Sequence, residues 1–216
     1  MAAGAVILAM GLVGLAHAPF ARSLLMTVGG CPMAGARMTP AMAERARRIA
    51  LATDRAALSA PARPALSFAL DTTTRDEAHA WARREGIACE DPRPGLMTCA
   101  RVEPEAVGLP PTGGRIDELA LEFDPRERLV NMTTFRTHLT PAVASAEARA
   151  IVASLADKLG PPEQRAGDFA TSRLGGPAAG SISTVRYRFD DYVADVTAMN
   201  APTSGPSIRE HYMSAL

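Results

Sequence analysis

The stretch IDELALEFDPRERLVNMTTFRTHL, residues 116–139, carries the clearest structural signal in the chain. Apolar residues alternate with polar or small ones from Leu119 to Phe123, which is the period of a strand with one buried face. Asp124-Pro125 is a typical turn pair, and the residues that follow are rich in Val and Thr. The pattern predicts a β-hairpin and therefore an antiparallel sheet.

Helical patterns stand before and after this hairpin. Thr74 and Glu77 form a capping box, and Gly86 is expected to end the helix that the box begins. Thr140-Pro141 begins a second helix, whose apolar residues recur at helical spacing as far as Gly160. Alternating or apolar runs predict further strands at 66–70, 96–102 and 184–200. The last of these is either a second hairpin or one long strand.

These elements predict an α+β fold: a meandering antiparallel sheet with two helices packed on one face. An apolar N-terminal helix and a separate amphipathic helix are expected to precede it. A helix followed by antiparallel strands occurs twice, from Thr74 and from Thr140. This doubled order resembles that of tandem-repeat periplasmic folds such as the β-lactamase inhibitor protein, and of single-repeat lipoproteins of the BamE type. The resemblance concerns the order of elements and implies nothing about activity.

Composition divides the chain into three parts. Residues 1–38 are an apolar N-terminal segment, 39–64 a basic helix with a Pro-rich linker, and 65–216 the globular domain. Residues 1–63 contain seven Arg against two acidic residues, and the rest of the chain is correspondingly acidic. A basic segment beside an apolar run is expected to meet membrane lipid headgroups. Since no zinc-finger spacing or basic–aromatic interleaving occurs, we expect no nucleic-acid partner.

The apolar stretch Ala2–Phe20 is long enough to cross a bilayer, which takes about 20 residues. Three interpretations stay open: a signal peptide cut after Ala18, a lipoprotein signal with lipidation of Cys31, and an uncleaved membrane anchor. The residues before Cys31 resemble a bacterial lipobox, but Arg22 interrupts the apolar run that such a signal needs. A core helix of a soluble protein is the residual alternative.

Two further cysteines, Cys89 and Cys99, bracket a turn rich in Pro and Gly. Such a turn can bring the two side chains within disulfide distance. A disulfide closing so short a loop would stabilise the fold by about 2–3 kcal/mol and would indicate an oxidising compartment such as the periplasm. The alternative is two small buried hydrophobic residues. If the two pair, Cys31 is left without an internal partner.

The sequence contains no catalytic or nucleotide-binding motif, so we assign no catalytic residue, metal ligand or cofactor. His79, His138, Asp190, Asp191 and Asp195 are weak polar candidates. The three aspartates could hold a hard cation, but they lack the spacing of an EF-hand. The more ordinary interpretation is a set of solvated turn acids and structural histidines.

Two functions remain open. The first is a non-enzymatic binding or assembly domain, membrane-associated or exported, whose sheet face or loop Gly167–Ser181 meets a protein partner. The alternative is a small enzyme or ligand-binding protein with a pocket between sheet and helices, which would use the weak polar candidates. The lack of catalytic motifs favours the first. We expect the chain to be membrane-anchored with its body in the periplasm, or secreted into the periplasm after cleavage.

Overall fold

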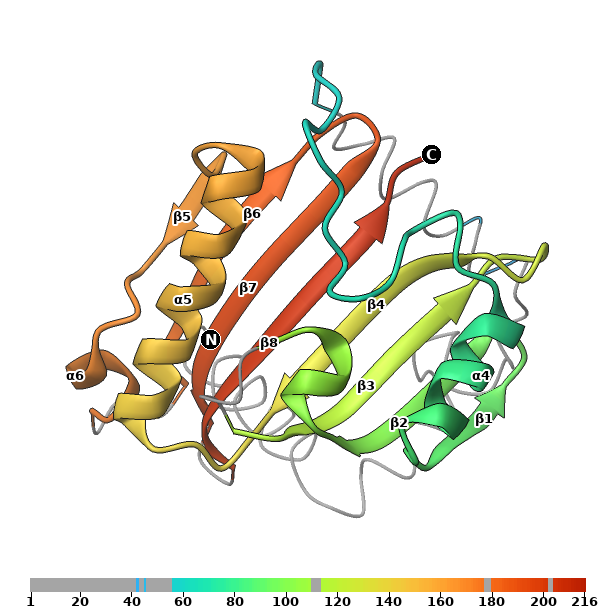
Figure 1. The fold of residues 1–216 in the computed structure, drawn as a ribbon. Helices are drawn as coiled ribbons and strands as arrows, with labels where there is room; N and C mark the ends of the chain where they lie inside the picture. The colour runs from blue at the N-terminus through green and yellow to red at the C-terminus, as the bar shows by residue number, and fades with distance from the viewer. Residues whose placement is uncertain (1–41, 43–44, 46–55, 110–113, 177–179, 202–203) are drawn as a thin grey trace, which may run out of the picture. The chain divides into compact units, whose positions relative to one another are not determined.

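The computed structural model describes residues 42, 45, 56–109, 114–176, 180–201 and 204–216. Its main feature is an antiparallel sheet of eight strands in the spatial order β1-β2-β3-β4-β8-β7-β6-β5 (Figure 1). The strands are β1 (Cys89–Arg93), β2 (Leu96–Val102), β3 (Ile116–Phe123), β4 (Leu129–Arg136), β5 (Gln164–Ala166), β6 (Ile182–Arg188), β7 (Tyr192–Ala201) and β8 (Gly205–Ser214). The predicted α+β class and antiparallel sheet are confirmed.

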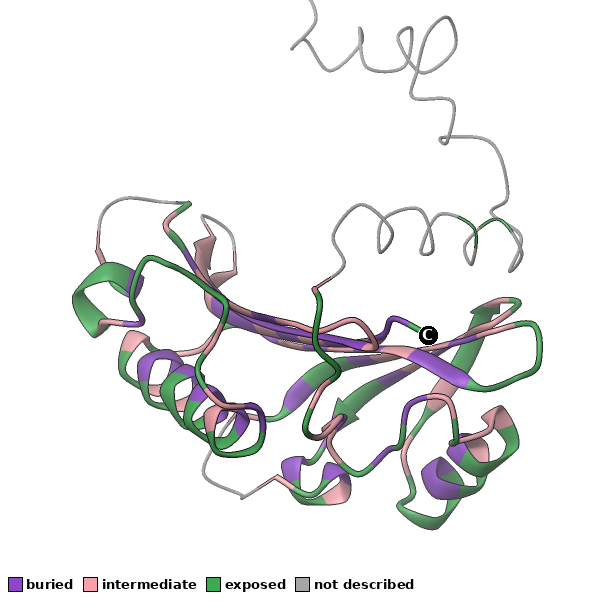
Figure 2. Ribbon diagram, turned by 90° about the horizontal axis from the view of Figure 1, so that it is seen from above, coloured by how far each residue is buried: buried purple, intermediate pink, exposed green. Residues whose placement is uncertain are grey.

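The main helices are α4 (Arg75–Arg84) and α5 (Pro141–Leu159), and both lie on the same face of the sheet (Figures 1 and 2). The Thr74 side chain accepts from the Glu77 backbone N–H, and the Glu77 carboxylate accepts from the Thr74 N–H at 2.7 Å. Both helices begin where their caps predict. Two shorter helical segments are α6 (Thr171–Leu174) and the 3-10 helix η1 (Pro104–Val107).

The topology repeats one plan twice. Helix α4 is followed by the meander β1–β4, and α5 by the meander β5–β8, with β4 and β8 pairing at the centre of the sheet. The segment 184–200 is a hairpin of β6 and β7, which decides between the two alternatives for that segment. Strand β8 was not predicted, because charged residues on both of its faces obscure the apolar period.

The prediction of a strand at 66–70 is wrong. Only isolated bridges occur there, between Ala65 and its neighbours Ser67 and Phe68. The apolar residues of this segment fill the space between sheet and helices instead, with Phe68 edge-on to Trp81 at a centroid distance of 4.9 Å. The Pro-rich stretch Ser59–Ala65 also packs on the sheet, since the Pro64 carbonyl accepts from the Tyr192 hydroxyl.

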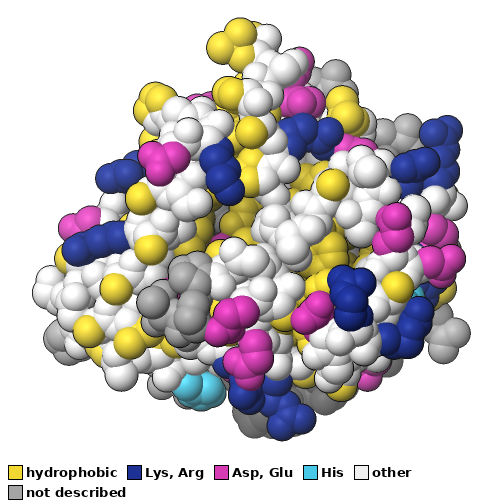
Figure 3. All heavy atoms as spheres, viewed as in Figure 1, with side chains coloured by type: hydrophobic (Ala, Val, Ile, Leu, Met, Phe, Trp, Pro, Cys, Tyr) yellow, Lys and Arg dark blue, Asp and Glu magenta, His cyan; other side chains and the backbone are white. Residues whose placement is uncertain are grey.

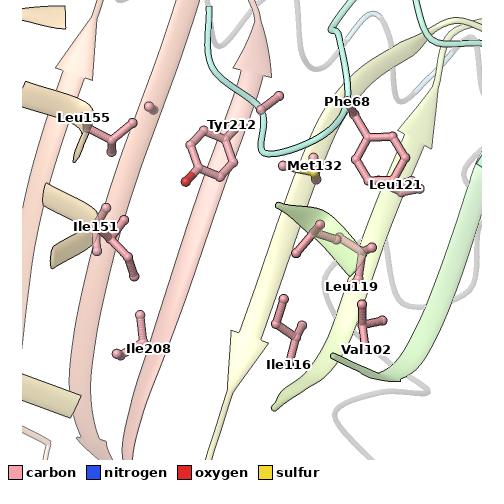
Figure 4. Close-up of a cluster of buried hydrophobic side chains, with 14 of the residues drawn as sticks. Phe68, Val102, Ile116, Leu119, Leu121, Met132, Ile151, Leu155, Ile208 and Tyr212 are labelled. Carbon is pink, nitrogen blue, oxygen red and sulfur yellow. The ribbon is translucent and has the colours of Figure 1, made fainter. Parts of the chain in front are cut away.

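The hydrophobic core lies between the helices and the face of the sheet that they cover. Its side chains come from the strands, both helices and the segment around Phe68. Figure 4 shows part of this core, with labelled side chains from the sheet, from α5 and from Phe68. Trp81 of α4 is buried, and its indole N–H donates to the Ala106 carbonyl at 3.1 Å, so its polar atom is satisfied. Cys89 and Cys99 lie opposite each other on β1 and β2 and form a disulfide, as predicted.

Predictions for the N-terminal part fall outside the described residues. These are the apolar helix, the possible lipidation of Cys31, the signal-peptide cleavage and nearly all of the amphipathic helix in 39–64. Within the described ranges, no helix combines the length and the apolar character needed to span a membrane.

Candidate functional site

The five weak polar candidates do not share one site. His79 of α4 lies 3.2 Å from Asp91 of β1, and His138 is exposed just beyond β4. Asp190 and Asp191 lie in the turn between β6 and β7, where Asp191 accepts from the Ala60 backbone N–H at 2.8 Å. Within the described ranges, no three His, Cys, Asp or Glu side chains gather as metal ligands would.

Asp195 is the most tightly held of the five. It lies on β7, on the face of the sheet opposite the one that α4 and α5 cover, and its side chain is only 3% exposed. Arg209 donates to one carboxylate oxygen at 2.5 Å, and the His211 Nδ1 lies 2.8 Å from the other. Burial raises the pKa of Asp195, but hydrogen bonds and charge from His211 and Arg209 outweigh it, so the pKa is lowered. These contacts join β7 to β8.

A second polar cluster lies on the opposite, covered face of the sheet. On β4, Arg136 has the same orientation as the buried Met132, two pairs of residues along the strand. On β8, Glu210 lies between the buried residues Ile208 and Tyr212 in the same way. The pairing of β4 with β8 sets these two inward-facing charges beside each other.

Arg136 and Glu210 form an ion pair in the interior. The Arg136 Nη2 lies 2.6 Å from the Glu210 Oε1, and their side chains are 2% and 0% exposed. The Arg136 Nη1 also donates to Glu147 of α5 at 2.9 Å. Tyr212 donates to the second Glu210 oxygen at 2.6 Å, and Thr134 donates to the first at 3.3 Å. We call these five residues the buried polar cluster.

The cluster is almost fully hydrogen-bonded, with one exception. The Nε of Arg136 is buried and has no acceptor among the described residues. Burial, followed by the charge of Glu210, raises the pKa of Tyr212 well above its usual value, so Tyr212 stays a neutral donor. An arginine donor left unpaired in the interior is costly.

A cavity of about 340 Å³ lies against this cluster, between α5 and the segments around Leu66 and Leu109. We call it the α5 groove. Figure 3 shows a hollow near the centre of the covered face, with hydrophobic side chains gathered in it. Apolar walls come from Pro64, Leu66, Leu109, Ala150, Ile151 and Leu155, and polar groups from Arg136, Glu147, Ser154, Lys158, Glu210 and Tyr212.

The volume of the α5 groove falls in the lower part of the range found for small-molecule sites. Its apolar walls with a few converging polar groups are also typical of such sites. A larger depression of about 740 Å³ lies beyond the end of α4, but mostly exposed residues line it, and none of its charged residues is buried. The α5 groove is therefore the better candidate site.

Sequence reasoning missed every charged residue of the groove, although a signal existed. In MTTFR (132–136), Arg136 continues the alternation of Met132 and Thr134. In IREHY (208–212), Glu210 lies midway between two apolar residues of the same face. A charge at a core position of a strand marks a buried polar site.

Comparisons of the chain with known protein families, curated proteins and solved structures find no match.

Proposed function

We propose that this protein is a non-enzymatic binding domain that takes up a small molecule in the α5 groove. The observation that carries the proposal is the position of the buried polar cluster, which forms one wall of a cavity whose other walls are largely apolar. This arrangement fixes the orientation of a ligand through a few polar groups and contributes affinity through apolar contact.

The energetic cost of the cluster supports a role beyond stability. Replacing a buried ion pair with apolar side chains of similar volume is often neutral or stabilising, so a fold does not need one in its core. The interior beneath α4 illustrates the alternative, because Met97, Leu119 and Leu121 fill it together with Trp81 and Phe68. Charged groups beside a cavity are what a binding site requires.

The proposal includes an exported setting. The disulfide between Cys89 and Cys99 is compatible with an oxidising compartment, and the apolar stretch Ala2–Phe20 suits a signal or an anchor in contact with membrane lipid. Intact mass spectrometry of the protein from its own host tests this setting. A full-length chain without lipid, found in a cytosolic fraction, would contradict it.

A protein partner remains part of the proposal. The face of the sheet opposite α4 and α5 offers a rigid polar group for it, because Arg209, Asp195 and His211 are fixed by their mutual contacts. This group is separate from the α5 groove, since the two lie on opposite faces of the sheet.

A groove-filling substitution tests ligand binding. Ser154 of α5 is exposed and lines the groove, so Ser154→Trp would fill the groove without disturbing the core. Ala153 is also exposed but lines a different depression, which makes Ala153→Trp the matched control. The measurement is native mass spectrometry of the full chain purified from its own host.

We expect the wild type and Ala153→Trp to carry a small-molecule adduct of the same mass, and Ser154→Trp to lack it. An adduct that persists in Ser154→Trp would place the ligand elsewhere. A wild-type protein without any adduct would contradict the proposed function.

A further inference from the structure

The charges around the α5 groove define the class of molecule that it can accept. Building on the proposed function, we infer that the ligand is an amphiphile with an apolar body and a neutral head that accepts hydrogen bonds, such as an amide or ketone. A free carboxylate is disfavoured at the same position. The inference rests on three features of the groove: its charge balance, its remaining donor and its apolar walls.

The first feature is a surplus of negative charge at the polar wall. One arginine, Arg136, faces two carboxylates, Glu210 at 2.6 Å and Glu147 at 2.9 Å. The three side chains are between 0% and 14% exposed, so water screens their charges little. A carboxylate placed against this wall would meet a net negative charge, whereas a neutral carbonyl would not.

The second feature is the pattern of donors and acceptors. Arg136 and Tyr212 already donate to the Glu210 oxygens, and Arg136 also donates to Glu147. The cluster therefore has little need of a further donor. Its one unsatisfied group among the described residues, the buried Arg136 Nε, is also a donor, so a head that accepts hydrogen bonds suits this wall better than one that only donates.

The third feature is the remainder of the wall. Leu66 and Leu109 face the groove from one side, and Ile151 and Leu155 of α5 from the other. These side chains suit an apolar body and offer it no hydrogen bond. Lys158 also lines the groove, but it is exposed, so water screens its charge and it offsets little of the negative charge at the buried polar wall.

Octanamide and octanoate are suitable probes, because they differ in their heads and share one apolar body. Their affinities would be measured by calorimetry at neutral pH with the full chain in lipid nanodiscs. Ser154→Trp in the same nanodiscs is the blank, which corrects for partition of the probes into lipid.

Two charge variants test the role of the negative wall. Glu147→Gln removes one negative charge while keeping an acceptor for Arg136. Glu127→Gln makes the same change at an exposed site outside the groove.

We expect octanamide to bind the wild type at least about tenfold more tightly than octanoate. Repulsion between the octanoate carboxylate and one unbalanced negative charge within ~10 Å, at an effective dielectric constant of ~20, produces a factor of this size. Glu147→Gln should reduce this preference to about twofold, and Glu127→Gln should leave it unchanged.

The outcomes separate the inference from the proposed function. Octanoate binding as tightly as octanamide would overturn the neutral-head inference while leaving a ligand-binding groove. A preference that survives Glu147→Gln unchanged would also overturn it. Failure of both probes to bind, together with no adduct on the wild-type protein, would remove the proposed function and the inference with it.

Discussion

The interiors beneath the two helices differ although the same order of elements builds both. Beneath α4, Trp81 packs on Phe68, and the disulfide joins β1 to β2 at the neighbouring edge of the sheet. Beneath α5, Arg136 and Glu210 lie buried beside a cavity of about 340 Å³. One interior is therefore filled by apolar side chains, whereas the other keeps costly polar groups and open space. The proposed binding role would account for that difference.

The largest effect is expected from breaking the ion pair beneath α5. Arg136→Met leaves the Glu210 carboxylate buried without its cation, which should lower the free energy of unfolding by about 3–5 kcal/mol. Urea denaturation of the full chain measures it.

The double variant Arg136→Met/Glu210→Leu replaces the ion pair with apolar side chains, so that the interior beneath α5 resembles the interior beneath α4. We expect it to recover most of the lost stability while losing the ligand adduct. A double variant no more stable than Arg136→Met would show that the pair itself stabilises the fold.

The next effect concerns the edge beside α4. Cys89→Ala/Cys99→Ala opens a loop with a sequence separation of ten residues and should lower stability by about 2–3 kcal/mol. The adduct in the α5 groove should persist, because the disulfide lies at the far edge of the sheet from α5. Loss of the adduct in a still-folded variant would mean that the two interiors are coupled.

A smaller effect is expected from Asp195, on the face of the sheet opposite α4 and α5. Its pKa is lowered in the folded state, so its ionised form stabilises the fold above the unfolded pKa of about 4. That stability is lost as the pH falls below about 4 toward the folded pKa. Asp195→Asn should therefore cost about 1–2 kcal/mol at pH 7 and less at pH 3. Denaturation midpoints at the two pH values measure the difference, and an equal loss at both would contradict the assignment.

The smallest effect compares the two helix caps. Thr74 has a reciprocal capping box with Glu77, whereas Thr140 accepts from the Val143 N–H alone, at 3.3 Å. Thr74→Ala should cost about 1 kcal/mol and Thr140→Ala about half of that. Thermal unfolding of the two variants side by side provides the measurement. A larger loss for Thr140→Ala would reverse this ranking of the caps.

Much of the fold could be predicted because its signals are local. The caps at Thr74 and Thr140, the turn at Asp124-Pro125 and the disulfide all depend on residues within about ten positions of one another. Strands β1 and β5 were missed because they are short and largely exposed, so burial leaves no pattern in them. The prediction of a strand at 66–70 was wrong because apolar residues that fill a space in the core have the same sequence pattern as a short buried strand.

The candidate site depended on information of a different kind. The sequence indicated a location, since a pocket between sheet and helices was one of the two alternatives, but it pointed to the wrong side chains. Asp195 and His79 stood out as titratable residues near other polar groups, yet the structure pairs Asp195 with Arg209 and His211 and places His79 beside Asp91, away from the groove. Arg136 and Glu210 each lie in a strand whose alternation places them inside, and neither strand alone shows its partner.

The two main helices, the β3–β4 hairpin, the disulfide and the antiparallel character of the sheet could be predicted from the sequence, because each follows from backbone preferences and short-range contacts. The pairing of β4 with β8, and the packing of α5 against β7 and β8, are visible only in the tertiary structure. That pairing joins Arg136 to Glu210 across 74 positions of sequence. A buried charge can be tolerated only where the whole fold supplies its partner, so the site emerges when the two meanders meet at the centre of the sheet.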